Sequence, residues 1–321
     1  MPAPRLHGGE LAYDAMRLGF FPWQRERRLA KERERENIAR FSSRVLAAGT
    51  FHSLALRREG GIACWGRNDE DQAPPDGIDG DFVAVAAGVK HSLALRGDGR
   101  FASWGRNNHG QAPPDGVDGD FVAIAAGGEH SLSLRSNGGI ACWGYNNHGQ
   151  APPAGVDGDF IAIAAGYLHS LALRRDGGVT CWGYNGSGQA PPDGADGDFV
   201  AIAAGDLHSL ALRRDGGVTC WGFNAFGQAP PDGVDGDFVA IAGGGRHSLA
   251  LRRDGSVACL GDNELDQAPP DGVEGDFVAI AASGNHSLAL RRDGGVTCWG
   301  RNMYGQAPPN GVAGPFKTQE L

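Results

Sequence analysis

The sequence predicts an all-β fold: a seven-bladed β-propeller of 39-residue, mainly three-stranded blades, preceded by a helical segment. One unit, written AAGYLHSLALRRDGGVTCWGYNGSGQAPPDGADGDF from Ala164, recurs seven times. Its histidines are spaced by 39 residues throughout, at His52, His91, His130, His169, His208, His247 and His286. Of the 18 prolines, 14 form seven APP motifs, so turn residues also recur at a fixed interval.

Residues 1–41 form the predicted N-terminal extension. Up to residue 44 the chain holds ten Lys and Arg against six Asp and Glu. The stretch from Trp23 to Arg40 has strong helix formers with Glu and Arg at helical spacing. We expect a solvated helix that caps the edge of the propeller. The alternative is an arm that docks to an acidic partner or to RNA.

Within the unit we expect three strands. DFVAIAAG, at Asp198–Gly205, is a short β-branched run, and HSLALRRD alternates from His208, which predicts a strand with one face better buried. The glycines of DGG at Asp215 accept a tight hairpin turn, and VTCWG is the third strand. The long loop that follows, with prolines and glycines, is too polar and too broken for a helix.

A lone three-stranded sheet of this size cannot bury both of its faces. Seven units stacked around an axis cover one another, so residues 42–321 are assigned to a propeller rather than to a linear β-solenoid. Two segments compete for the first strand of the first blade. We expect Arg44–Ala48 to form it, with Pro315–Leu321 added at an edge or frayed.

Charge and cysteines limit the environment and the partners. The net charge is −9, which makes duplex nucleic acid an unlikely ligand because such binding needs basic surface. The six cysteines occupy one equivalent site in different units, which indicates small buried residues in a reducing compartment. With no apolar run long enough for a membrane span, we expect a cytoplasmic protein. The alternative is an organellar transit peptide at the N-terminus, against which Glu10 and Asp14 count. We expect the propeller to be a monomer.

No cofactor or metal site is predicted. Asp232, Asp235 and Asp237 in the DGVDGD loop lack the spacing of a calcium loop, and Asp-Gly turns explain them. The seven histidines cannot converge on one centre, so we assign them to a buried hydrogen bond that fixes the loop above. The tryptophans are expected to fill the gaps between blades.

The letters that vary between copies fall in two loops, AAGxxH and WGxNxx. In an up-down-up blade both loops lie at the same end, here called the top face. Several of the variable residues are aromatic or apolar, as protein-binding hot spots are. The predicted partner-binding residues are Phe51, Tyr145, Tyr167, Leu168, Tyr184, Leu207, Phe223, Phe226, Arg301 and Tyr304.

The pattern AAGxxHSLALRxDGxVxxWGxNxxGQ resembles the repeat of the regulator of chromosome condensation family, over roughly residues 42–311. The resemblance implies a seven-bladed propeller. In unit length the chain is similar to the bacterial seven-bladed β-lactamase inhibitor protein, whose binding residues lie in the same two loops. The family's exchange factor for a GTPase has an inserted wedge, which these uniform units lack. The tryptophans used by its ultraviolet-B photoreceptor are also missing before the histidines.

We therefore predict a non-enzymatic scaffold that binds a protein partner through the top face. The first alternative is an inhibitor of an enzyme such as a β-lactamase. The second is a guanine nucleotide exchange factor for a small GTPase. No nucleophile and base, metal set or phosphate loop stands outside the repeated frame, which disfavours an enzyme with a site in the central channel.

Overall fold

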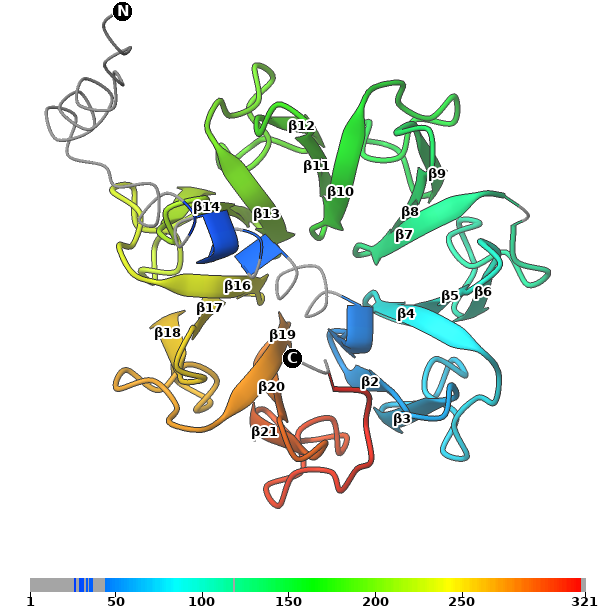
Figure 1. Ribbon diagram of the computed structural model, residues 1–321. Coiled ribbons are helices and arrows are strands. Elements are labelled where there is room, and N and C mark those ends of the chain that lie inside the picture. The colour runs from blue at the N-terminus through cyan, green and yellow to red at the C-terminus, as the bar shows by residue number, and fades with distance from the viewer. Residues whose placement is uncertain are drawn as a thin grey trace, which may run out of the picture.

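The computed structural model describes residues 26, 29–31, 33, 35–36, 44–117 and 119–318. Seven three-stranded antiparallel sheets stand around a common axis as the blades of a propeller (Figure 1). In each blade the strands follow one another in sequence order from the axis outward. The predicted seven-bladed all-β fold is confirmed.

The strands of each blade repeat at matching positions. Blade one contains β1 (Leu46–Ala48), β2 (His52–Leu56) and β3 (Ile62–Gly66), and blade two β4 (Phe82–Ala87), β5 (His91–Arg96) and β6 (Phe101–Gly105). Blade three contains β7 (Phe121–Ala126), β8 (His130–Arg135) and β9 (Ile140–Gly144), and blade four β10 (Phe160–Ala165), β11 (His169–Arg174) and β12 (Val179–Gly183). Blade five contains β13 (Phe199–Ala204), β14 (His208–Arg213) and β15 (Val218–Gly222). Blade six contains β16 (Phe238–Gly243), β17 (His247–Arg252) and β18 (Val257–Gly261), and blade seven β19 (Phe277–Ser283), β20 (His286–Arg291) and β21 (Val296–Gly300).

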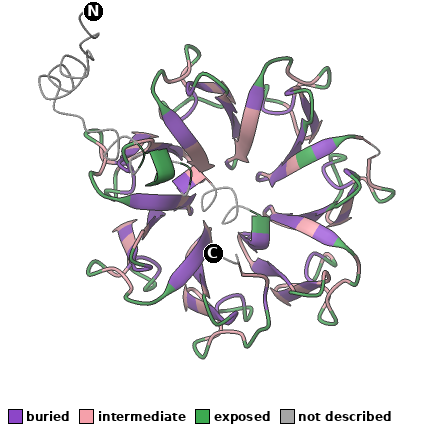
Figure 2. Ribbon diagram, in the orientation of Figure 1, coloured by how far each residue is buried: buried purple, intermediate pink, exposed green. Residues whose placement is uncertain are grey.

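The middle strand of each blade is buried on both faces, whereas its alternation predicted one better buried face. In β14 every residue from His208 to Leu212 is buried. The leucine side faces one neighbouring blade, and the small Ser and Ala side lets the other neighbour approach closely. Exposed residues are concentrated in the loops (Figure 2). The correction follows from stacking, which leaves no solvent face on the strand at the centre of a blade.

A hydrogen-bond relay joins each blade to the next. In the typical case His169 Nε2 lies 3.0 Å from Ser209 Oγ, and that hydroxyl donates to the carbonyl of Gln189 at 2.9 Å. The hydroxyl hydrogen is thus committed to the carbonyl, so the imidazole donates through Nε2. The same His–Ser contact recurs at all seven boundaries. The histidines are structural, as predicted, but they fix the neighbouring blade rather than only the loop above.

Burial keeps these imidazoles neutral. It lowers their pKa to about 3 at His52, His130, His169 and His247, and to about 4 at His91, His208 and His286. Neighbouring histidines on the ring lower the pKa further at several positions, for example at His130. An uncharged donor at every blade boundary is what the relay requires.

Tryptophans and cysteines also serve the packing between blades. The indole of Trp182 donates to the carbonyl of Gln150 at 3.0 Å, the same oxygen that accepts from Ser170. All six cysteines are buried free thiols, and burial raises the pKa of each to about 12. These thiols are therefore small packing groups and not nucleophiles.

Both chain ends complete blade one. β1 pairs with β2 from Leu46 to Ala48, as predicted, but residues 44–45 are helical. Phe316 then forms a bridge with Arg57, just as Phe82 pairs with Arg96 in blade two. Its side chain is only 4% exposed, so Pro315 and Phe316 are built into the blade and do not fray there.

The described part of the N-terminal extension is helical at residues 26, 29–31, 33 and 35–36, which agrees with the predicted helix. These residues lie over blades five and six, at the end opposite the top face (Figure 1). We call this end the bottom face; it carries the DG hairpins. The remainder of the extension up to residue 43 lies outside the described residues.

Aspartates of the bottom loops pair with arginines. Asp235 lies 2.7 Å from Arg213, and Asp237 lies 3.0 Å from Arg253. These are two of the three aspartates weighed above as calcium ligands. Among the described residues, no three His, Cys, Asp or Glu side chains gather as a metal site would require.

Candidate functional site: the top face

The two variable loops of each blade lie side by side on the top face. The residue after WG donates its backbone N–H to the carbonyl of the residue before His. In blade four Tyr184 N lies 2.8 Å from Leu168 O, and in blade five Phe223 N lies 2.8 Å from Leu207 O. The other five blades repeat this bond. The up-down-up path therefore does bring the variable residues to one end.

The conserved letters of the second loop hold it in shape. In blade four the side-chain oxygen of Asn185 accepts from Ala190 N at 2.8 Å, and that of Gln189 accepts from Ser187 N at 2.9 Å. Gly188 has φ +79°, a conformation that favours glycine. The residues between these anchors are free to vary in side chain without a change in backbone path.

Aromatic rings link neighbouring blades across the top face. Tyr145 of blade three contacts His109 of blade two at 5.1 Å between ring centroids. His148 then lies 6.3 Å from Tyr145 and 5.2 Å from Tyr184 of blade four. Four rings thus form a chain across blades two to four. We call His109, Tyr145, His148 and Tyr184 the ring chain.

Two further groups of predicted residues come together. Phe223 and Phe226 pack edge-on at 6.2 Å, and Arg246 of blade six lies 4.9 Å from the ring of Phe226. Phe51 of blade one meets Tyr304 of blade seven at 5.7 Å, with the Arg67 guanidinium 5.0 Å from the Tyr304 ring. In the ring chain and in both of these groups, the residue two positions before the glutamine of the GQ motif contacts a side chain of the next blade.

The remaining predicted residues are placed separately. Tyr167 is 44% exposed and lies at the mouth of the central channel. Leu168 and Leu207 are half-buried in the first loops, and Arg301 donates to the Met303 sulfur at 2.9 Å. His148 and the 43% exposed Leu265 were missed. The signal for both is their position, which matches that of Phe226 and Tyr304 in the repeat.

Charged residues of blades one to three pair with one another on the top face. Lys90 of blade two lies 3.1 Å from Glu70 of blade one. Glu129 of blade three contacts Arg106 at 3.4 Å and His109 at 3.2 Å. These exposed pairs contribute little to stability.

The central channel offers little chemistry. It encloses about 500 Å³ and is lined mostly by alanine and aliphatic residues of the inner strands. At its top mouth burial raises the pKa of Asp206 to about 6, although Arg246 acts in the opposite direction. Asp206 itself is half-buried. Of the described residues that line the channel, none is a histidine, cysteine or lysine, and the Ser136 hydroxyl in its wall donates to the Asp120 carboxylate.

The comparisons identify the family. The model of the regulator of chromosome condensation (RCC1) repeat matches residues 45–72, 82–111, 121–150, 160–189, 199–228, 238–267 and 277–306. The chain belongs to the RCC1-repeat family. The sequence resemblance inferred from the repeat is therefore confirmed. Among curated proteins, none matches the chain.

Solved structures share this fold. The CRINKLY ectodomain of the Arabidopsis thaliana receptor kinase ACR4 is 23% identical, with a TM-score of 0.66 over 84% of this chain and 98% of that one. Prp20p from Saccharomyces cerevisiae is 22% identical, with a TM-score of 0.65 over 76% and 81%. Human WBSCR16 is 20% identical, with a TM-score of 0.64 over 76% and 85%. At these identities the likeness establishes the RCC1-type propeller and nothing about partners.

In the part of the chain that is described, no helix is both long and apolar enough to span a membrane.

Proposed function

We propose that this RCC1-repeat propeller is a non-enzymatic scaffold that binds a protein partner through its top face. The observation that carries the proposal is the ring chain, in which four aromatic side chains from three blades contact one another in sequence. Aromatic residues held in place by their neighbours lose little conformational entropy on binding, which suits them to protein interfaces.

The solvent exposure of aromatic side chains also supports the top face as the binding surface. Tyr184, Phe226 and Tyr304 are 36%, 38% and 40% exposed, so each presents ring surface to solvent while its base is packed. Charged pairs flank the rings, which matches a polar rim around an apolar centre. A folded protein, which can contact several blades at once, fits such a broad surface better than a small metabolite does.

The proposed setting is the cytoplasm, with the propeller as a monomer. Six buried free thiols fit a reducing compartment. The ring closes on itself through β1 and β19 together with Phe316, so association with a second copy is not needed to complete a blade.

Site-specific photo-crosslinking in the cells of origin tests the proposal. A benzoylphenylalanine at position 184 is expected to crosslink a discrete protein, and one at the bottom-face position 292 is not. The variant with Phe226→Ala and Tyr304→Ala should reduce that crosslink severalfold. A matched bottom-face variant with Arg100→Ala and Arg292→Ala should leave it unchanged. Equal crosslinking from positions 184 and 292 would refute the assignment.

Two assays with the purified propeller distinguish the scaffold from an exchange factor and from an enzyme inhibitor. If it accelerates nucleotide release from a small GTPase, it is an exchange factor. If it blocks a β-lactamase at a stoichiometric ratio, it is an inhibitor. The scaffold proposal expects neither activity from any of the enzymes tested.

A further inference from the structure

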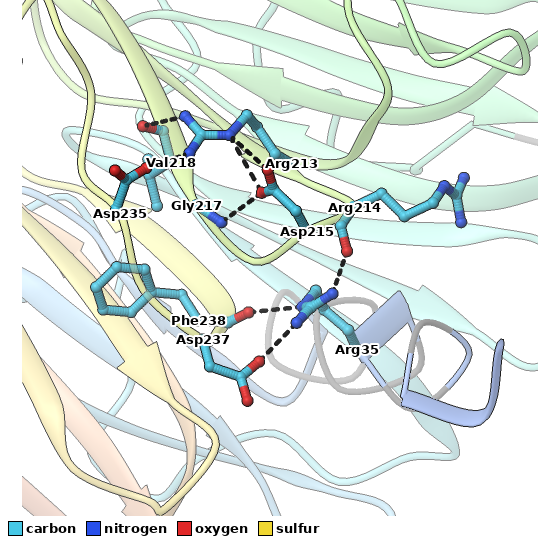
Figure 3. Close-up of polar contacts among 9 residues, drawn as sticks. All are labelled: Arg35, Arg213, Arg214, Asp215, Gly217, Val218, Asp235, Asp237 and Phe238. Carbon is cyan, nitrogen blue, oxygen red and sulfur yellow. Dashed lines mark hydrogen bonds and ion pairs between the residues drawn. The ribbon is translucent and has the colours of Figure 1, made fainter. Parts of the chain in front are cut away.

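Arg35 fills a pocket between two blades on the bottom face. Its Nε donates to the carbonyl of Phe238 at 2.8 Å, and Nη2 donates to Asp237 Oδ1 at 2.6 Å (Figure 3). Nη1 donates to the carbonyl of Arg214. The arginine is only 4% exposed, so two backbone carbonyls and a carboxylate receive a guanidinium almost removed from water. Such a donor set suits the planar fork of arginine and not a lysine ammonium.

The position of Gly216 explains how the guanidinium fits. A side chain there would place its Cβ 2.7 Å from Arg35 Nη2, and the residue has φ +100°. Gly216 also accepts from Phe238 N at 3.0 Å, which fixes the pocket wall. The pocket is therefore made of repeated parts. They are the hairpin glycine Gly216, the hairpin residue Arg214 two positions before it, and the pair Asp237 and Phe238 at the start of the next inner strand.

One repeat earlier, the same parts enclose a second pocket, between blades four and five. It encloses about 210 Å³, and its lining includes Arg175, Gly177 and Phe199. These are the equivalents, 39 residues earlier, of Arg214, Gly216 and Phe238. Phe199 N lies 3.0 Å from Gly177 O, as in the occupied pocket, and Asp198 stands where Asp237 does. The backbone frame of the two pockets is the same.

Around the second pocket the acidic groups outnumber the basic ones by one: Asp159, Asp176, Asp198 and Glu36 stand against Arg174, Arg175 and Arg214. Asp176 and Glu36 line the pocket, and Asp176 lies 3.0 Å from Arg174. Its two lining arginines are already engaged: Arg175 lies 2.8 Å from Asp159, and Arg214 lies 2.6 Å from Glu36 and 2.9 Å from Asp198. Asp159 and Asp198 are well exposed and keep free lone pairs for a further donor.

We propose that the pocket between blades four and five binds an arginine side chain of a second protein. The guanidinium would donate to the carbonyls of Arg175 and Phe199 and to the Asp198 carboxylate, as Arg35 does one blade further on. Glu36 lines the opening, so the incoming segment packs beside the helical residues 35–36 of this chain. The site is on the bottom face and is independent of the proposed top-face function.

NMR titration of the full-length protein tests this site. N-acetylarginine methylamide is expected to shift the amides of Gly177 and Phe199 saturably, about tenfold more tightly than N-acetyllysine methylamide. The variant Asp198→Asn should lose most of this binding, whereas Asp237→Asn, in the occupied pocket, should keep it. Equal binding of the lysine and arginine probes would overturn the proposal. So would tighter binding of free L-arginine, because a small-molecule site would then replace a protein-docking site.

Arg35→Ala supplies a positive control. Removal of that side chain should open the first pocket, so that the arginine probe also shifts Gly216 and Phe238 and the stoichiometry rises from one to two. Binding at Gly216 in this variant without binding at Gly177 in either protein would show that only the first pocket accepts a guanidinium, and the proposal would fail.

Discussion

The imidazole Nε2 of His286 lies 3.0 Å from the hydroxyl of Ser53, and this hydrogen bond joins the last blade to the first across 233 residues of sequence. Ser53 in turn donates to the carbonyl of Gln306 at 3.0 Å. The closing boundary thus uses the relay of the other six boundaries. The His–Ser contact therefore closes the ring between two blades that lie at opposite ends of the repeat array.

Ser53→Ala should destabilise the propeller by about 2–3 kcal/mol, because it leaves buried His286 without an acceptor and removes a donor from Gln306. The urea midpoint, followed by tryptophan fluorescence, measures this. A midpoint equal to that of the wild type would mean that the seam is held by apolar packing alone.

Ser133→Ala is the same chemical change as Ser53→Ala, but here we expect the stability of the protein to rise. The Ser133 hydroxyl is buried in blade three without a hydrogen-bond partner among the described atoms, and the other six repeats have alanine there. Its removal should stabilise the protein by about 1 kcal/mol, since a desolvated unpaired hydroxyl is lost. A loss of stability in this variant would indicate that the hydroxyl is satisfied by bound water.

The seven buried histidines predict strong sensitivity to mild acid. In the unfolded chain each imidazole gains its proton around pH 6.5, whereas the folded-state pKa is about 3 to 4. Below pH 6.5 the unfolded state therefore binds more protons, and stability falls as the pH falls. The slope for seven groups approaches roughly 9.5 kcal/mol per pH unit once the imidazoles of the unfolded chain are fully protonated, and it is about half of that at pH 6.5. Because domains are stable by only about 5–15 kcal/mol, unfolding is expected between pH 6.5 and about 5.

Unfolding monitored by circular dichroism from pH 8 to 4 checks this. His169→Gln should lower stability at pH 7 and reduce the slope by about one part in seven. The raised pKa of Asp206 increases stability as the pH falls, but this single group opposes the effect of seven histidines. The aspartates with lowered pKa, such as Asp215, lose their contribution only in more acidic solution. A urea midpoint that stays constant from pH 7 to 5 would contradict the assigned neutral imidazoles.

The period of 39 residues and the phase of its strands were predictable because each strand is encoded locally. The predicted Asp198–Gly205 run became β13 (Phe199–Ala204), and the alternation at His208 became β14 (His208–Arg213). The meeting of the two variable loops also followed, since antiparallel strands of known order fix which loops share an end.

Contacts between blades were harder to predict. The partner of six of the seven histidines is a serine 40 residues further on, and that of His286 is Ser53 of the first blade. A repeat pattern does not reveal which equivalent atoms face each other. Arg35 is one of ten basic residues in a segment of mixed charge, and only the bottom-face carbonyls distinguish it. By contrast, the segment around Phe316 carried a repeat signal, because Phe316 falls 39 residues after Phe277, and this made Pro315–Leu321 a candidate for an edge of blade one.

Asp71 and Asp266 stand where the other repeats have the glycine of NxxGQ, and both adopt φ +59°. Asp71→Gly and Asp266→Gly should each stabilise the protein by about 0.5–1 kcal/mol, because glycine adopts this conformation without steric cost. Thermal unfolding measures the gain. The reverse change, Gly110→Asp, should cost a similar amount, since a Cβ there meets nothing within 4 Å and only the backbone is strained. If all three variants melt at the temperature of the wild-type protein, aspartate adopts this turn conformation without a measurable cost.

Phe316 is the seventh copy of a phenylalanine whose other six copies begin the inner strands of blades two to seven, and in the sequence repeat its position corresponds to Ser43 of blade one. It is buried with Leu56 and Ile62, and its ring lies 6.3 Å from Trp65. Phe316→Ala should therefore cost about 3–5 kcal/mol, as removal of a buried aromatic side chain does elsewhere. Lys317→Ala is the matched control, because its contact with Leu56 is made by the backbone N–H and survives the change. If the two variants melt at the same temperature, blade one is complete without the C-terminal segment, and closure depends on β1 and the His286–Ser53 bond alone.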